Sequence, residues 1–175
     1  MSKFNSNIQK IKLLYFKLTG KINEHNFRLN TGVKEDSIKK ILFIFPFKEE
    51  EFNVAKYCFR SIISNNDTEC IYLINNVFYS TSHFMGTTYG FNYLKNKEKI
   101  IFNENFFDDN ILNSHFDAVI NLECKFNLDL SMIINKIFAR YKVGFKNEYS
   151  DLFYNIQFEY ATLENGYNKI NSLLQ

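Results

Sequence analysis

The chain has 175 residues, of which 46% are hydrophobic and 18% aromatic, and its formal net charge is +2. This length suits one domain, and the single proline argues against a linker-rich or disordered chain. So small a net charge gives no argument for nucleic-acid binding, and no apolar segment approaches the roughly 20 residues that cross a bilayer.

The charge is unevenly distributed along the chain. Residues 1–40 contain nine Lys or Arg and three acidic residues, whereas the other 135 residues contain 12 basic and 16 acidic residues. This pattern indicates a basic arm attached to a mildly acidic body. We therefore divide the chain into a basic helical arm and connector at 1–37 and a main domain at 38–175.

Cysteine and histidine spacing gives no metal or disulfide motif. The three cysteines show no CxxC spacing, and the three histidines show no HxxH or HxxE spacing. We expect neither a disulfide framework nor a metal, and no cofactor. Residues 1–20 also lack the uninterrupted apolar stretch of a signal peptide, so we expect a reduced, cytoplasmic, soluble protein.

Residues 4–19 are predicted to form an amphipathic helix that ends near Gly20. Its apolar positions recur at helical spacing: Ile8, Ile11, Leu14, Tyr15 and Leu18. This helix has three interpretations: it packs on the body, binds a protein partner, or binds an anionic membrane surface. The candidate partner-binding residues are Lys10, Lys12, Lys17 and Lys21.

The rest of the chain alternates between strand-like and helix-like segments. Strands are predicted at 39–47, 69–75, 99–102, 116–123 and 141–145, with a further strand at the end of 148–158 left open. Helices are predicted at 49–64, 104–114, 127–140 and 161–174. Residues 76–98 have no clear period, and a short helix or loop followed by a turn is expected there.

Strands that alternate with helices predict an α/β fold, a single Rossmann-like doubly wound parallel sheet with the order 3-2-1-4-5. In such a sheet ligands lie beyond the carboxyl ends of the strands, here between the first and fourth. The residues expected to face that crevice are Phe47, Lys48, Glu49, Glu123, Cys124, Lys125 and Asn127.

The turn after the first strand, PFKEEEF, disfavours nucleotide binding because it has no glycine and three carboxylates. Glu123 is interpreted either as a general base or as half of a solvated ion pair with Lys125. Cys124 is either a nucleophile at a strand-to-helix turn or a small core residue. Lys48, Lys125 and Asn127 are the candidate ligand-binding residues.

Three segments carry a family resemblance: KKILFIF, FDAVINLE with the helix predicted after it at 127–140, and YKVGF. In these segments the chain resembles the amino-terminal half of glycosyltransferase family 9, the ADP-heptose:lipopolysaccharide heptosyltransferase group. The resemblance covers residues 39–158 and implies a Rossmann-like fold. The family has a small-residue-Gly-Asp turn that supplies the catalytic base, where this chain has Glu49 and Glu50. The family's aspartate in the fourth strand is Asn121 here, and its donor site lies in a second, carboxyl-terminal domain without counterpart in this sequence.

Two functions follow as hypotheses. The first is a non-catalytic binding or assembly module that docks to a protein partner or larger complex through its amino-terminal arm. The alternative is the acceptor-binding half of a glycosyltransferase that works with a separate donor-binding chain. In that case Glu49, Glu50 or Glu123 is the base that deprotonates an acceptor hydroxyl.

Overall fold

The computed structural model describes residues 2–22, 38–64, 68–108 and 111–174. Within these ranges seven strands form one sheet in the order β4-β3-β2-β1-β5-β6-β7. The strands are β1 (Lys40–Ile44), β2 (Glu69–Asn75), β3 (Thr87–Leu94), β4 (Lys99–Phe102), β5 (His115–Asn121), β6 (Phe138–Phe145) and β7 (Ile156–Phe158). Neighbouring strands are parallel except β3 and β4, which pair antiparallel at one edge.

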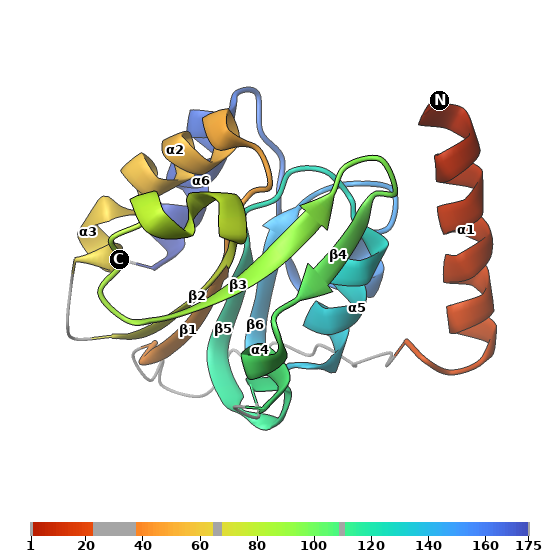
Figure 1. The fold of residues 1–175 in the computed structure, drawn as a ribbon, viewed down its shortest axis with the longest axis horizontal. Coiled ribbons are helices and arrows are strands. Elements are labelled where there is room, and N and C mark those ends of the chain that lie inside the picture. Colours follow the sequence, from red (N-terminus) through yellow and green to blue (C-terminus); the bar gives the residue numbers. More distant parts are fainter. Residues whose placement is uncertain (1, 23–37, 65–67, 109–110, 175) are drawn as a thin grey trace.

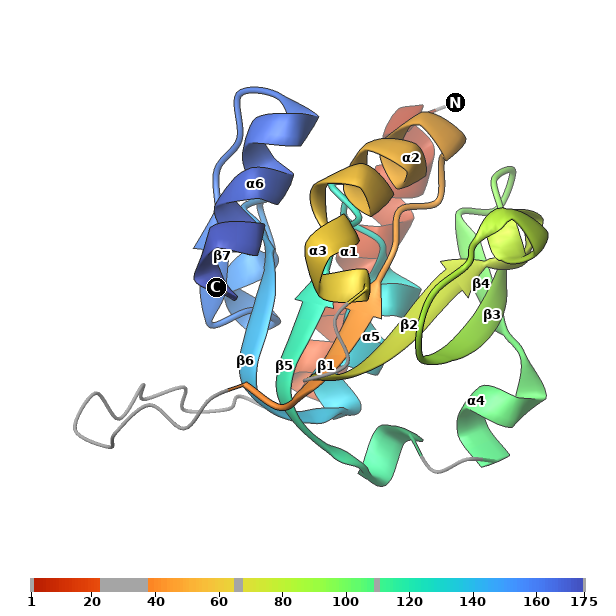
Figure 2. The same cartoon turned by 90° about the vertical axis from the view of Figure 1, so that its left-hand side faces the viewer.

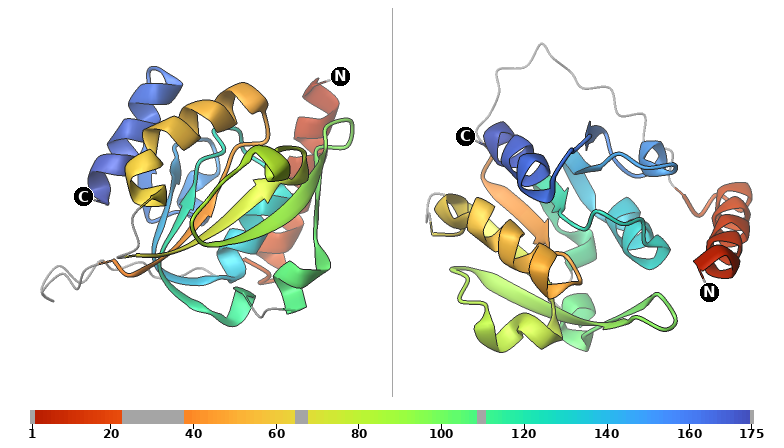
Figure 3. Two further views of the ribbon diagram at one scale, coloured as in Figure 1. Left: turned by 60° about the vertical axis from the view of Figure 1, so that its left-hand side comes forward. Right: turned by 90° about the horizontal axis from the view of Figure 1, so that it is seen from above.

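Helices cover both faces of the sheet, as the view from above in Figure 3 shows. The α-helices are α1 (Ser2–Leu18), α2 (Glu49–Cys58), α3 (Arg60–Ile63), α4 (Glu104–Asp108), α5 (Leu128–Lys136) and α6 (Leu163–Leu173). Short 3₁₀ helices are η1 (Asn76–Thr81), η2 (Ile111–Asn113) and η3 (Ser150–Leu152). Helices α2, α3 and α6 lie on one face, α5 lies on the other, and α1 lies outside α5 (Figures 1 and 3).

The central strands separate two hydrophobic cores because successive side chains point to opposite faces of the sheet. In β1, Leu42 and Ile44 join the core beneath α5, whereas Ile41 and Phe43 join the core beneath α2 and α6. The second core is rich in aromatic rings: Phe43 and Tyr72 stack at 5.9 Å, and Tyr72 and Phe84 at 4.5 Å. This arrangement explains why β1 reads as a continuous apolar run.

The predicted fold class is confirmed, and the predicted strands keep their relative order. The prediction for residues 76–98 was incomplete, because it missed β3, which lies between β2 and the edge strand β4 (Figure 1). Figure 2 shows β3 and β4 together at one edge of the sheet. Gly90 and the polar residues of TTYGFNYL weaken the strand pattern, yet Tyr89 and Phe91 are buried on one face. Gly90 is required because a Cβ there would overlap the Asn76 side-chain amide.

Several element boundaries differ from the prediction: the first strand ends at Ile44, the fourth predicted strand ends at Asn121, and the helix predicted at 104–114 is the shorter α4 followed by η2. The predicted helix at 49–64 divides into α2 and α3 at Phe59, and the predicted helix at 127–140 ends at Lys136. Strand β6 then begins at Phe138, three residues before the predicted start. The predicted connector falls largely on residues 23–37, which lie outside the described residues.

Candidate functional site

The predicted crevice at the carboxyl ends of β1 and β5 is occupied by the chain's own polar groups. The Glu123 side chain is 4% exposed, and its two oxygens accept hydrogen bonds from the Phe47 N–H at 3.0 Å and the Lys125 N–H at 2.9 Å. Burial raises the pKa of Glu123, while these two N–H groups oppose that rise. The carboxylate therefore joins the end of β5 to the turn that leads from β1 into α2.

This bonding favours a positioning role for Glu123 over that of a general base. A base must present an oxygen to a substrate proton, whereas each Glu123 oxygen is engaged by a backbone donor. The predicted partner Lys125 is exposed and meets Glu123 through its backbone N–H. Neither of the two predicted roles describes this geometry, in which the carboxylate binds main-chain groups.

The three acids at the start of α2 differ in position. Glu49 and Glu50 are exposed, whereas Glu51 is buried and its Oε1 lies 2.6 Å from the Lys48 Nζ. This hydrogen bond to Glu51 is the main cause that raises the pKa of Lys48. The Glu51 Oε2 is buried without a hydrogen-bond partner. The sequence analysis missed Glu51, although its i,i+3 spacing from Lys48 is the signal that pairs them.

Amides continue the network on the β5 side. The Asn121 Oδ1 accepts from the Glu123 N–H at 3.1 Å, and its Nδ2 donates to the Tyr154 Oη at 2.7 Å. Burial raises the pKa of Tyr154 to about 12, so its hydroxyl is neutral at physiological pH. We call Phe47, Lys48, Glu51, Asn121 and Glu123 the strand-end cluster.

Two further predicted site residues have structural roles. Asn127 caps α5: its Oδ1 accepts from the Leu130 N–H at 3.0 Å, and its Nδ2 donates to the Glu98 carbonyl at 3.0 Å. Cys124 lies 3.8 Å from the Tyr167 hydroxyl, and burial raises the thiol's pKa to about 11. The thiol is therefore protonated at neutral pH, which favours its interpretation as a core residue over that of a nucleophile.

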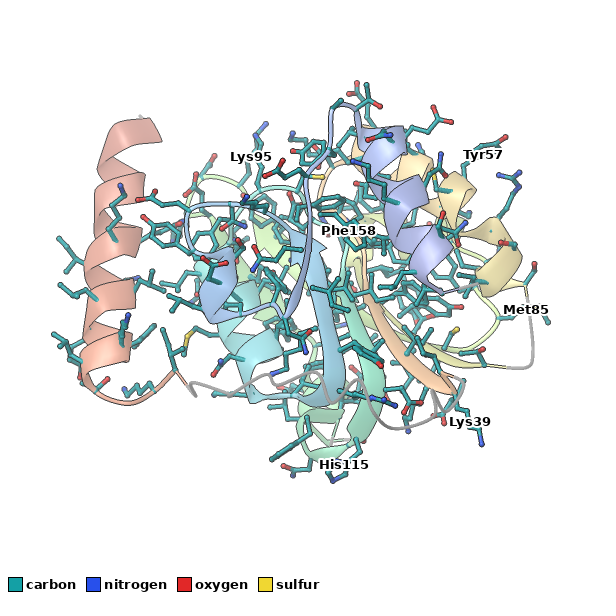
Figure 4. All side chains as sticks on the ribbon, turned by 180° about the vertical axis from the view of Figure 1, so that it is seen from behind. Lys39, Tyr57, Met85, Lys95, His115 and Phe158 are labelled. Carbon is teal, nitrogen blue, oxygen red and sulfur yellow. The ribbon has the colours of Figure 1, made fainter. Side chains whose placement is uncertain are left out.

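Helix α1 has two opposite apolar sides: one packs on the body, and the other is exposed. The sequence pattern predicted a single apolar stripe. Leu13, 6% exposed, and the partly buried Phe16 pack against the core beneath α5. The opposite side carries most of the predicted stripe, with exposed fractions of 69% for Ile11, 59% for Leu14, 55% for Tyr15 and 79% for Leu18. We call these four residues the outer face of α1, and Figure 4 shows side chains projecting from that side of the helix, away from the body.

Of the predicted partner-binding lysines, Lys10 links α1 to the body, whereas Lys21 contacts an aromatic ring of α1 itself. The Lys10 Nζ lies 3.3 Å from the Glu148 Oε1, and the Lys21 Nζ lies 5.4 Å from the centre of the Tyr15 ring. Lys12 borders a cavity between α1 and the body, and Lys17 is exposed in the last turn of α1. The lysines thus lie along the flanks of the outer face.

Comparison with known proteins gives no match with any protein-family model, curated protein or solved structure. Among the described residues, no group of three or more His, Cys, Asp or Glu side chains could hold a metal ion. Within the same ranges, no helix has both the length and the apolar character needed to cross a bilayer. The functional argument therefore rests on the geometry of the strand-end cluster and of α1.

Proposed function

We propose that the protein is a non-catalytic binding module that docks to a protein partner through the outer face of α1. The observation that carries the proposal is this face itself, on which four large apolar side chains are more than half exposed on one helix. Isolated exposed apolar residues are ordinary, but a contiguous stripe of them marks an interaction surface.

The spacing of the stripe favours a groove on a protein as the occupant. Ile11, Leu14, Tyr15 and Leu18 occupy positions i, i+3, i+4 and i+7, the arrangement with which helices anchor in hydrophobic grooves. The stripe is two turns long, about 10 Å at 1.5 Å per residue, which suits a groove better than the extended face of a membrane-surface helix.

The positive charge of α1 indicates what kind of partner it binds and argues against a second copy of the chain as that partner. Helix α1 contains four lysines and no acidic residue. Two such helices packed face to face would bring lysines together without a compensating carboxylate. We therefore propose a partner whose apolar groove has an acidic rim. The three cysteines are unpaired, which fits a reduced, cytoplasmic setting for this complex.

The alternative proposal, the acceptor half of a two-chain glycosyltransferase, has less support. It needs a carboxylate that can take a proton from an acceptor hydroxyl. Both oxygens of Glu123 accept hydrogen bonds from backbone N–H groups. Glu49 and Glu50 are exposed in the first turn of α2. No observation favours this alternative, and it stays the secondary hypothesis.

The docking proposal is tested with a double variant and a matched control. Leu14→Ser/Leu18→Ser removes two anchors of the outer face, and Val77→Ser/Tyr79→Ser removes two similarly exposed apolar residues on η1. Native purification with the wild-type chain identifies the partner, and the purified pair is then titrated. We expect the α1 variant to bind about tenfold more weakly or worse, the control to bind normally, and added salt to weaken binding.

Three outcomes would overturn the docking proposal. Equal binding of the partner by both double variants would place the interface elsewhere. Flotation with vesicles of phosphatidylcholine and phosphatidylserine, lost in the α1 variant, would replace the protein partner with a membrane surface. A dimer in sedimentation analysis that the α1 variant abolishes would replace it with a second copy.

A further inference from the structure

A cavity of about 310 Å³ lies where α1, the β3–β4 turn and the start of α5 meet. Lys12 borders it from α1, and Lys97 and Lys99 border it from the turn and the first residue of β4. Figure 4 labels Lys95, in the same turn, at the side of the body nearest α1. Three cationic side chains from two separate parts of the chain thus surround one space.

Two acidic residues, Glu98 and Asp129, also line the cavity, and each is hydrogen-bonded to a neutral group of the chain. The Glu98 Oε2 accepts a hydrogen bond from the Gln9 Nε2 at 2.9 Å, and the Asp129 Oδ2 accepts one from the Ile100 N–H at 3.1 Å. No ion pair joins either carboxylate to the cavity lysines in the part of the chain that the structure describes. The three ammonium groups are therefore free to bind an anion.

The backbone holds these lysines in place. Glu98 has a φ of +48°, in the left-handed region that non-glycine residues rarely adopt. Its carbonyl accepts from the Asn127 Nδ2 at 3.0 Å, and its N–H donates to the Lys95 carbonyl at 3.4 Å. Strained backbone persists where surrounding bonds determine it, and it concentrates at binding sites. The turn therefore presents Lys97 and Lys99 from a fixed conformation.

The nearby end of α5 adds a favourable field. Leu128 and Asp129, the first two residues of α5, also border the cavity. A helix amino terminus carries partial positive charge, which attracts anions. The cavity is thus lined by three lysines and by the amino-terminal end of a helix, and its volume lies at the lower end of the range of small-molecule sites.

We propose that this cavity binds a small anionic ligand with at least two phosphate groups. A diphosphate suits the cavity better than a single phosphate, because it is larger and delivers more negative charge to the three lysines that line the cavity. Bound there, the ligand bridges α1 to the body and holds the helix in its docked position. This site is separate from the outer face of α1 and does not depend on the proposed docking function.

Calorimetric titration with inorganic pyrophosphate at constant ionic strength tests the proposal. We expect saturable binding by the wild-type chain and at least about tenfold weaker binding by Lys12→Gln/Lys97→Gln/Lys99→Gln. The matched control, Lys39→Gln/Lys136→Gln/Lys169→Gln, removes the same charge from three exposed lysines that do not line the cavity and should bind like the wild type. Inorganic sulfate should bind much more weakly than pyrophosphate.

A gain-of-binding variant separates a binding defect from misfolding. Glu98→Gln removes a negative charge from the cavity wall, so pyrophosphate should bind several-fold more tightly. Equal losses in the two lysine triples, equal binding of sulfate and pyrophosphate, or no binding by the wild-type chain would each overturn the proposal. Circular dichroism of every variant checks that the fold is intact.

Discussion

The strand-end cluster and the outer face of α1 differ in which kind of side chain is buried and which is exposed. In the cluster, the polar residues Glu51, Asn121 and Glu123 are buried, and the side chains of Asn121 and Glu123 are hydrogen-bonded to the chain's own groups. On α1, apolar groups that could have been buried are exposed, because Leu13 and Phe16 pack against the body instead. Where this kind of fold usually binds ligands, buried carboxylate and amide groups are bonded to the chain itself, and the exposed apolar surface lies on the amino-terminal helix.

The largest expected effect tests whether the strand-end cluster is structural. Glu123→Leu introduces an apolar side chain of similar size and removes both acceptor oxygens, which leaves the Phe47 and Lys125 N–H groups without partners. We expect the free energy of unfolding to fall by about 3 kcal/mol, measured by urea denaturation. The exposed Glu50→Ala should change it by less than about 0.5 kcal/mol. If the two substitutions change the free energy of unfolding by nearly equal amounts, Glu123 has no special structural role.

The second prediction concerns the buried side of α1. Leu13→Ala should lower the free energy of local opening of this helix by about 2 kcal/mol, because it deletes most of a buried side chain. Hydrogen exchange of the α1 amides measures this opening directly. An undocked helix of this length is marginal in water, so its amides should then exchange much faster. Unchanged exchange would mean that Leu13 does not hold α1 to the body.

A pH series sharpens the account of Glu123. Because the folded pKa of Glu123 is raised, the native state holds its proton to higher pH than the unfolded chain. Its contribution to stability is therefore fully present below the unfolded pKa and is lost as pH rises through the folded pKa. We expect the stability difference between wild type and Glu123→Gln to shrink with rising pH across that window. A difference that grows with pH would indicate a lowered folded pKa.

The smallest effect is expected on the outer face of α1. Leu14→Ser should change the melting temperature very little, with less than about 0.5 kcal/mol of lost stability, because Leu14 is already 59% exposed. Scanning calorimetry beside Leu13→Ala compares two neighbouring leucines on opposite sides of one helix. A loss from Leu14→Ser as large as that from Leu13→Ala would show that both sides of α1 are covered by the chain itself.

Much of the fold could be predicted from the sequence pattern, and the errors of that prediction have physical causes. The continuous apolar runs at β1, β2 and β5 and the helical periods of α2, α5 and α6 predicted a doubly wound sheet. Strand β3 was missed because its stability comes from contacts that local pattern does not record. Gly90 accommodates the Asn76 amide, and Tyr89 and Phe91 fill the core beneath α5.

The candidate site was predicted in position but not in chemistry. Sequence placed Lys48 and Glu123 at neighbouring strand ends, and the structure brings them there. It could not show that Glu123 binds main-chain N–H groups, since backbone donors are the same for every sequence. Nor could the sequence show that Glu51 is the buried acid and that Glu49 and Glu50 are exposed. Which of the three is buried depends on which side of α2 packs against the sheet.

The sequence by itself determined the α/β class, the order of most strands and a basic amphipathic helix at the amino terminus, because periodicity and charge are local properties. Only the tertiary structure decided which side of that helix is covered, since Leu13 and Leu14 are equally apolar and differ only in what lies opposite them. It also decided that Glu123 binds the main chain at the strand ends and that Lys12, Lys97 and Lys99 border one cavity. These are juxtapositions of distant segments, which packing alone creates.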